Sequence, residues 1–254
     1  MALWTSKNTF PNPIFSWTAA GLLLVTAVLV MPRTALFHTV KLRLLGRFTV
    51  AERVEQYGER ARQRLAPHFE AAGVSYPPDR FLFAGFKQED VLEVYAANAG
   101  EALKFIRSYP ILAASGRLGP KLMEGDRQVP EGLYRIESLN PNSRFHLSIR
   151  VNYPNAHDRR RGAEEGRSDL GGDIMIHGNA VSIGCLAMGD PAAEELFILA
   201  AETGWQDVPI ILSPVDFRTT NLPADFEPPT TWTAELHEQI KERVLALPAS
   251  RRNR

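Results

Sequence analysis

The chain has 254 residues, of which 44% are hydrophobic and 23% charged, a composition that excludes a disordered or fibrous protein. The length accommodates one catalytic domain of ordinary size with additions at its ends. Lys plus Arg and Asp plus Glu balance at 29 each, so the chain lacks the basic excess of nucleic-acid-binding proteins, and we expect no nucleic acid among its partners.

The N-terminal segment predicts export. No charged residue occurs between Lys7 and Arg33, and residues 14–31 are apolar enough and just long enough to span a bilayer. We interpret residues 1–32 as a signal peptide or a membrane anchor, and favour the anchor because no clean cleavage site follows. A buried helix of a soluble protein is the alternative. The basic residues after the segment favour the opposite orientation, with the rest of the chain inside.

Next comes a helical pattern from about Thr49 to Ala72, which Pro67 is expected to end or kink. We interpret residues 33–75 as a helical spacer that holds the domain off the membrane, although this helix could also pack on the domain. Its arginines are expected to form a solvated face. Those arginines are Arg53, Arg60, Arg62 and Arg64.

Strand-like runs dominate residues 76–215. They are Arg80–Phe86, Val91–Ala96, Leu103–Tyr109, Leu133–Ile136, Phe145–Val151, Asp173–His177 and Val208–Leu212. Many short strands with turn-rich joins predict a mainly β domain, a sandwich or barrel-like sheet with flanking helices. One of those helices is expected at about Ala192–Ala201, after the N-cap candidate Asp190.

Two charged or turn-rich stretches are expected to be loops, Arg159–Glu165 and Asp225–Pro229. The last segment, residues 216–254, is interpreted as a C-terminal helical extension. Its helix, about Thr233–Leu247, carries an apolar stripe that should dock on the domain.

The nine residues His177–Cys185 hold the only cysteine of the chain, a histidine upstream of it and two glycines. A thiol is a good nucleophile only as a thiolate, and a nearby imidazole is the usual means of making one. A short strand would deliver His177 to a sheet edge, and Gly184 would let the backbone aim N–H groups at a substrate oxygen. The alternative is a buried structural cysteine and a hydrogen-bonded structural histidine.

These residues resemble the active-site signature of the YkuD-type L,D-transpeptidases: His177-Gly178, then Ser182-Ile183-Gly184-Cys185. The alanine and methionine at 187–188 are similar to the YafK-like branch of that family. Two earlier blocks, residues 115–134 and 140–156, resemble the same branch, so the likeness spans about residues 110–190. Many relatives have a histidine and an arginine where this chain has Ile183 and Ala187, so contacts of that arginine are not carried over.

The resemblance implies a β-rich catalytic domain in which Cys185 is the nucleophile and His177 its base. It places the oxyanion-binding turn around Gly184, with Ser182 and Gly178 beside it. Basic side chains in the matching blocks are candidates for binding the carboxylates of a peptidoglycan stem or for pinning loops. They are Lys121, Arg127 and Arg144.

The implied substrates are peptidoglycan stem peptides containing diaminopimelate, in the periplasm, with the inner membrane as attachment site. Acyl transfer to a second amine is one outcome. Hydrolysis of the same bond class, releasing an outer-membrane lipoprotein from peptidoglycan, is another. A non-catalytic wall-binding envelope protein is the alternative from a different class.

Neither a cofactor nor a metal is expected. A site built from Cys185, His177 and His157 is conceivable, but the spacings match no recognised zinc pattern. His146 and His157 are expected to be structural.

Overall fold

The computed structural model describes residues 46–250, so the predicted signal or anchor segment and the first part of the predicted spacer lie outside the described residues. Within 46–250, none of the helices combines the length and the apolar character that crossing a bilayer requires. From Phe48 onward these residues form one compact unit.

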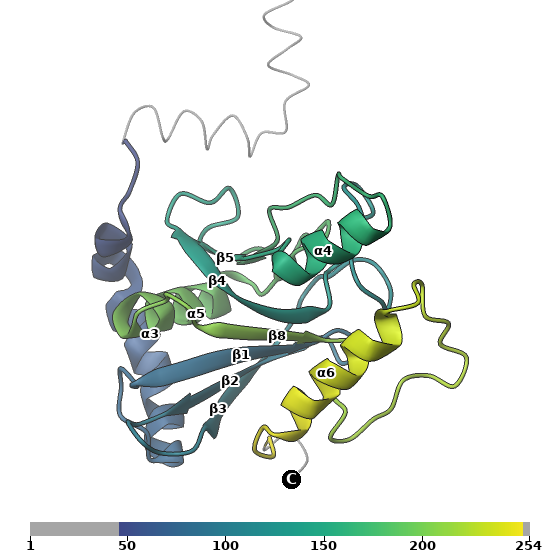
Figure 1. Cartoon of the computed structure of the whole chain (residues 1–254). Coiled ribbons are helices and arrows are strands. Elements are labelled where there is room, and N and C mark those ends of the chain that lie inside the picture. The colour runs from purple at the N-terminus through teal and green to yellow at the C-terminus, as the bar shows by residue number, and fades with distance from the viewer. Residues whose placement is uncertain (1–45, 251–254) are drawn as a thin grey trace, which may run out of the picture. The chain divides into compact units, whose positions relative to one another are not determined.

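A single mixed sheet organises this unit, in the spatial order β3-β2-β1-β8-β4-β5-β6-β7 (Figure 1). Its strands are β1 (Arg80–Phe86), β2 (Val91–Ala97), β3 (Lys104–Pro110), β4 (Gly132–Asn140), β5 (Ser148–Val151), β6 (Met175–His177), β7 (Leu186–Ala187) and β8 (Pro209–Ser213). The pairs β1–β8 and β6–β7 are parallel, and the others are antiparallel. The prediction of a mainly β domain with flanking helices is confirmed, and only the two-residue strand β7 has no counterpart among the predicted runs.

Both faces of the central strands are covered, which explains why β1 and β2 read as nearly continuous apolar runs. Side chains alternate between faces along a strand. Phe81 and Phe83 pack in one core with helices α3 (Val50–Ala72) and α5 (Asp190–Thr203). Leu82 and Phe86 pack in a second core with helix α6 (Thr233–Leu245). Figure 1 shows α3 and α5 on one side of the sheet and α6 on the other.

Helix α3 packs on the domain, which is the second of the two alternatives for this segment. It begins with a capping box between Thr49 and Glu52 and ends at Gly73, whose φ of 61° is left-handed. It continues through Pro67, which does not end it. Buried side chains at helical spacing, Ala61, Leu65 and Phe69, form its contact face.

The prediction that the arginines of α3 form a solvated face holds for Arg60, which is exposed, but is wrong for Arg53, and Arg62 and Arg64 are partly buried. Arg53 is buried and donates from Nε to the Pro141 carbonyl at 2.8 Å. The others reach acidic side chains of α5: Arg60 pairs with Glu194, Arg62 with Glu202, and Arg64 with both Glu194 and Glu195. The arginines are long enough for their stems to cover apolar surface while their guanidinium groups meet these carboxylates.

The prediction of a loop at Arg159–Glu165 is also wrong, because residues Ala156–Glu164 form helix α4. Asn155 is its N-cap and Asp158 completes a capping box, which satisfies the amides of the first turn. The capping pair Asn155 and Asp158 is the sequence feature that predicts this helix, whereas the run of charged residues after it favours a loop.

Replacing Phe69 with alanine tests whether α3 is part of the folded core. The side chain is 1% exposed, so Phe69→Ala should lower the free energy of unfolding by about 3–5 kcal/mol through lost burial and a residual cavity. Chemical denaturation measures the change. The adjacent exposed residue provides the control, since Glu70→Ala should leave the denaturation midpoint where it is. If α3 were a spacer detached from the domain, both variants would keep the parental denaturation midpoint.

Candidate active site

The parallel pair β6–β7 brings the two candidate catalytic residues to the same region. His177 pairs with Ala187, and Ile176 pairs with Leu186. Continued by one residue, this register sets Cys185 beside Met175, two positions before His177 on the neighbouring strand. Cys185 lies in the bend directly before β7 and His177 is the last residue of β6, so the two residues belong to neighbouring, parallel strands.

The Cys185 thiol is partly buried and lies against the backbone of the segment that enters β6. Sγ donates to the Asp173 carbonyl oxygen at 3.5 Å. Burial raises the pKa of Cys185, and the negative charge of Asp173 raises it further, whereas the Met175 backbone and the Lys121 ammonium act in the opposite direction. The net direction is upward, so the sulfur rests as a neutral thiol at neutral pH.

The His177 imidazole is held in one orientation. It is 2% exposed, it stacks on the Phe145 ring at 4.8 Å, and its Nδ1 lies 2.5 Å from the Gly178 carbonyl oxygen. That carbonyl accepts only from an N–H, which assigns the proton to Nδ1 and leaves Nε2 as a base. Burial lowers the pKa of His177, against the Gly178 carbonyl, which raises it.

The resting pair is therefore a neutral thiol and a neutral imidazole, not a thiolate with an imidazolium. His177 and Cys185, both described residues, make no hydrogen bond with each other. His177 Nδ1 and Cys185 Sγ each donate to a backbone carbonyl instead. Proton transfer between them requires the thiol to leave the Asp173 carbonyl.

Two serine hydroxyls fix the turn that carries the sulfur. Ser182 Oγ accepts from the Cys185 amide at 2.9 Å and donates to the Cys185 carbonyl at 2.5 Å. Ser115 Oγ accepts from the Gly184 amide at 2.7 Å and donates to the Arg127 carbonyl at 2.7 Å. Gly184 adopts φ +94°, a conformation that favours glycine. The two amides expected to bind an oxyanion thus donate to hydroxyls, which a substrate carbonyl oxygen would have to replace.

Gly178 is required by close packing. A Cβ atom at this position would lie 2.6 Å from Asp190 Oδ1 and 2.9 Å from the Phe145 carbonyl oxygen. The Gly178 amide also donates to the Leu147 carbonyl at 3.2 Å, which ties the strand end to β5.

The three basic candidates differ in their surroundings. Lys121 is buried, and its ammonium bonds Asp126 Oδ1 at 2.6 Å and the Met123 carbonyl at 2.8 Å. It therefore pins the 121–126 loop, and its charge reaches Cys185 from there. Arg127 and Arg144 are exposed, and Arg127 adjoins the turn through its carbonyl bond with Ser115.

The other histidines near the site make packing contacts. His146 bonds Glu194 at 3.1 Å and meets the Tyr57 ring edge-on, and His157 meets the Trp232 ring in the same way. In the part of the chain that the structure describes, no cluster of three or more His, Cys, Asp or Glu side chains is arranged to hold a metal ion.

A buried charged network supports the loop that contains Ser115. Lys87 Nζ donates to Glu131 Oε1 at 2.9 Å and to the Gly119 and Val129 carbonyls at 3.1 and 3.0 Å. Glu131 Oε2 lies 2.6 Å from Nε2 of His237 on α6. Burial lowers the pKa of Lys87. Burial also opposes ionisation of Glu131, but hydrogen bonds and charges from His237 and Lys87 outweigh it and hold the pKa of Glu131 below its usual range.

Sequence reasoning missed Ser115 and the Lys87–Glu131–His237 network. Ser115 lies in one of the blocks that carry the resemblance, but a serine in a loop has no pattern that marks a contact 69 residues away. The network joins side chains separated by up to 106 residues in sequence, and the fold alone brings them together.

Comparison with known families finds a match for residues 87–210, to the YkuD model of the L,D-transpeptidase catalytic domain. Among curated proteins, the chain is 42% identical over 114 residues to YafK of Escherichia coli strain K12, a protein named as an L,D-transpeptidase. The same match occurs with YafK of Escherichia coli O157:H7. The aligned part covers 44% of this chain and 44% of YafK, so the chain spans less than half the length of that relative.

Likeness to solved structures is weaker. The helical cell shape determining protein Pgp2 from Campylobacter jejuni is 22% identical with a TM-score of 0.43, over 54% of this chain and 48% of that one. L,D-transpeptidase 1 of Mycobacterium tuberculosis is 18% identical with a TM-score of 0.30, over 52% of this chain and 61% of that one.

The neutral thiol predicts a specific pH dependence of Cys185 alkylation. Because the pKa of Cys185 is raised, the rate of reaction with iodoacetamide should rise with an apparent pKa above the ordinary cysteine value of about 8.5. The rate is measured by mass spectrometry from pH 6 upward, with the urea-unfolded chain as reference. A rate that is already at its plateau near neutral pH would show a preformed thiolate instead.

Removing the negative charge of the buried network tests its contribution to stability. Glu131→Gln leaves the Lys87 ammonium buried without a countercharge and should lower the free energy of unfolding by about 3–5 kcal/mol. Urea denaturation measures the loss. The double variant Lys87→Met/Glu131→Gln should regain part of it, and the exposed control Glu242→Gln should keep the parental midpoint. A single variant as stable as the parent would contradict the role of the network.

Proposed function

We propose that the chain is a cysteine acyltransferase acting on peptidoglycan stem peptides, because residues 87–210 match the YkuD model of the L,D-transpeptidase catalytic domain. Cys185 forms a thioester with the substrate, and His177 moves the proton.

One observation carries this proposal: the only cysteine of the chain stands on a tight turn directly before β7, the strand that pairs with the strand of the buried His177 imidazole. A histidine with Nδ1 fixed on a carbonyl and Nε2 unprotonated has the tautomer required of a general base. A purely structural histidine would have no need of a partly accessible thiol beside it.

The reaction begins with a neutral pair, so the base must act as the bond forms. His177 Nε2 takes the thiol proton while Sγ attacks the carbonyl at the L-centre of diaminopimelate. The oxyanion displaces the hydroxyls of Ser115 and Ser182 and accepts from the amides of Gly184 and Cys185. Each such donor typically contributes about 3 kcal/mol to the transition state.

The tetrahedral intermediate then collapses. The C–N bond to D-alanine breaks, His177 returns its proton to the leaving amine, and the thioester remains on Cys185. A second amine or a water attacks the thioester, gives a proton through His177 to the departing sulfur, and releases a cross-linked or a hydrolysed product. Burial lowers the pKa of His177, so the base stays unprotonated and competent somewhat below neutral pH.

The location follows from the substrate. We place the reaction in the periplasm, where stem peptides occur, with the N-terminal segment as signal or inner-membrane anchor. A lipoprotein attached to peptidoglycan is the partner if water is the acceptor.

A non-catalytic wall-binding protein is the second candidate, and two observations favour it. The pKa of Cys185 is raised, and both amides expected to serve the oxyanion are occupied by hydroxyl groups. Such a site is either a resting state, in which a substrate displaces the hydroxyls from the amides, or a site that no longer reacts.

Incubation of the full chain with purified muropeptides tests the proposal. Mass spectrometry should detect either cross-linked dimers or freed tripeptides, which separates transfer from hydrolysis. Cys185→Ala should abolish turnover, and His177→Gln should reduce it by about 10²–10⁴-fold because the base is lost.

Arg243→Gln, an exposed change on α6, serves as the matched control and should retain parental activity. Turnover that survives Cys185→Ala would sink the thioester mechanism. Binding of muropeptides without any turnover in the parent chain would favour the wall-binding candidate.

A further inference from the structure

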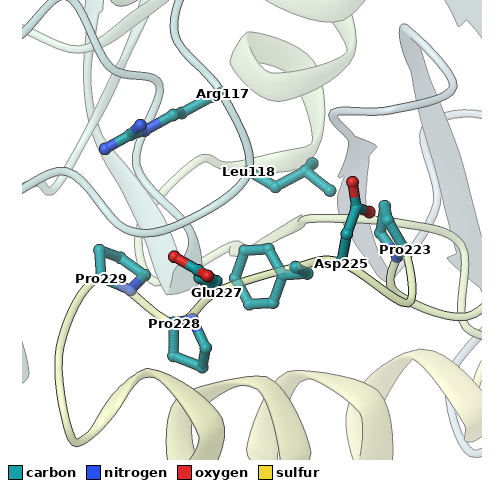
Figure 2. Close-up of a pocket in the computed structure, with 8 residues that line it drawn as sticks. Arg117, Leu118, Pro223, Asp225, Glu227, Pro228 and Pro229 are labelled. Atoms are coloured by element: carbon teal, nitrogen blue, oxygen red, sulfur yellow. The ribbon is translucent and has the colours of Figure 1, made fainter.

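A charged cavity of about 450 Å³ lies between the loop that follows Ser115 and the segment before α6 (Figure 2). Its charged lining residues are Arg117, Asp225 and Glu227. Phe226 in its wall packs on His237 with the ring centroids 5.4 Å apart, so the cavity adjoins the buried network. The ring contact that holds the His177 imidazole comes from a different segment, residues 145–146.

The Phe145 ring covers the imidazole of His177. The two rings stack with their centroids 4.8 Å apart and their planes at 28°. Phe145 is itself 37% exposed, whereas His177 beneath it is 2% exposed. The stack therefore shields the imidazole from water more than it buries the phenylalanine.

The same segment packs against the acceptor of the His177 hydrogen bond. A Cβ atom on Gly178 would lie 2.9 Å from His146 Cβ and 2.9 Å from the Phe145 carbonyl oxygen. The Gly178 carbonyl accepts the Nδ1 proton of His177 at 2.5 Å. Residues 145–146 thus contact both ends of the hydrogen bond that selects the tautomer of the base.

His146 has a backbone φ of +71°, in the left-handed region that bulky residues rarely adopt. Such a conformation persists only where the surrounding structure holds it, and it is concentrated at functional sites. At this residue the chain turns between two neighbours with different surroundings. Leu147 is fully buried in the core, and Phe145 lies over His177.

Side chains of two helices hold His146 in place. Its Nε2 lies 3.1 Å from Glu194 Oε1 of α5, and the Tyr57 ring of α3 meets its ring edge-on at 5.0 Å. A carboxylate only accepts, so Nε2 of His146 carries a proton. Arg60 and Arg64 of α3 hold Glu194 in turn. Helix α3 lies outside the residues that match the family model.

We propose that His146 is a positioning residue for the general base. Held by α3 and α5, it keeps the Phe145 ring on His177 and the 145–146 backbone against Gly178. Nδ1 of His177 thereby stays protonated, and Nε2 stays free to take the thiol proton. The inference rests on the proposed function, because it identifies what orients the base of that reaction.

Nitrogen NMR of the full chain, purified in mild detergent with isotope-labelled histidine, tests this assignment. His177→Gln identifies the signals of His177, which in the parent should show a protonated Nδ1 and an unprotonated Nε2. Phe145→Ala and His146→Ala should each mix the two tautomers. They should also raise the pKa of His177 toward its ordinary value of about 6.5, because the imidazole loses its cover.

Conservative variants separate positioning from a general loss of packing. Phe145→Tyr keeps the aromatic ring and should give the parental His177 signals. His146→Asn keeps a side chain that tolerates the left-handed backbone and should shift these signals less than His146→Ala does. The matched control is Leu245→Ala, an exposed apolar truncation on α6, which should leave them unchanged.

Parental His177 signals in both alanine variants would overturn the proposal. An asparagine variant that shifts them as much as the alanine variant would remove the left-handed turn from it. Because Phe145 is exposed, its substitution leaves the core intact, so the Phe145 pair decides the test even if His146→Ala does not fold.

Turnover of muropeptides supplies a second measurement. Phe145→Ala and His146→Ala should lower kcat about tenfold with little change in KM, since the stacked pair orients the base. Altered His177 signals in a chain whose parent shows no turnover would keep the positioning assignment and remove the transferase. Turnover in the parent, together with parental His177 signals in both alanine variants, would do the reverse.

Discussion

The architecture around the sulfur depends on one buried ion pair, Lys87 with Glu131. The lysine follows β1, and its ammonium gathers backbone carbonyls of the 115–131 loop, while the glutamate beneath it also holds His237 of α6. A buried charge is costly unless it is paired and fully hydrogen-bonded, so this pair tolerates few alternative arrangements. The loop that it fixes then presents Ser115 to the Gly184 amide. The turn that carries Cys185 is thus fixed from two sides. The β6–β7 pairing holds the strand that follows it, and the Ser115 hydroxyl connects it to the buried network.

The protonation states of Cys185 and His177 in the resting site follow from the burial of the two side chains. Both catalytic candidates are shielded from water, which disfavours the charged form of each and leaves a thiol beside a neutral imidazole. An isolated thiolate in such a site would require a strong positive field, and the Lys121 ammonium, whose charge reaches Cys185, is already bound to Asp126. In the mechanism that we propose, the proton therefore moves during the reaction, after a substrate carbonyl has displaced the serine hydroxyls.

Local periodicity predicted most of the fold, and long-range contacts account for what it missed. Alternating and continuous apolar runs located seven of the eight strands, because burial on one or both faces leaves a direct imprint on sequence. The strand β7 has only two residues, which is too short for an alternating or continuous apolar run to be recognised. The sequence gives no sign that Arg62 and Arg64 are partly buried, because their acidic partners on α5 lie 130 or more residues away. Motif spacing singled out Cys185 and His177 and also placed Ser182 at the turn. The Lys121–Asp126 ion pair, by contrast, depended on backbone geometry that no spacing encodes.

The C-terminal extension belongs to the functional unit even though the family match ends at residue 210. Its helix α6 covers one face of the sheet with Leu236, Ile240 and Val244, and the same helix delivers His237 to Glu131. Phe226, in the segment before α6, rests on that histidine, so the outer wall of the charged cavity and the support of the catalytic turn share one side chain. Among residues 46–250, His237 Nδ1 is buried without a hydrogen-bond partner, and Glu131 is the polar side chain that holds the ring. A substitution that breaks the His237–Glu131 contact would therefore disturb two places. It would reach the cavity through Phe226 and the Cys185 turn through Glu131.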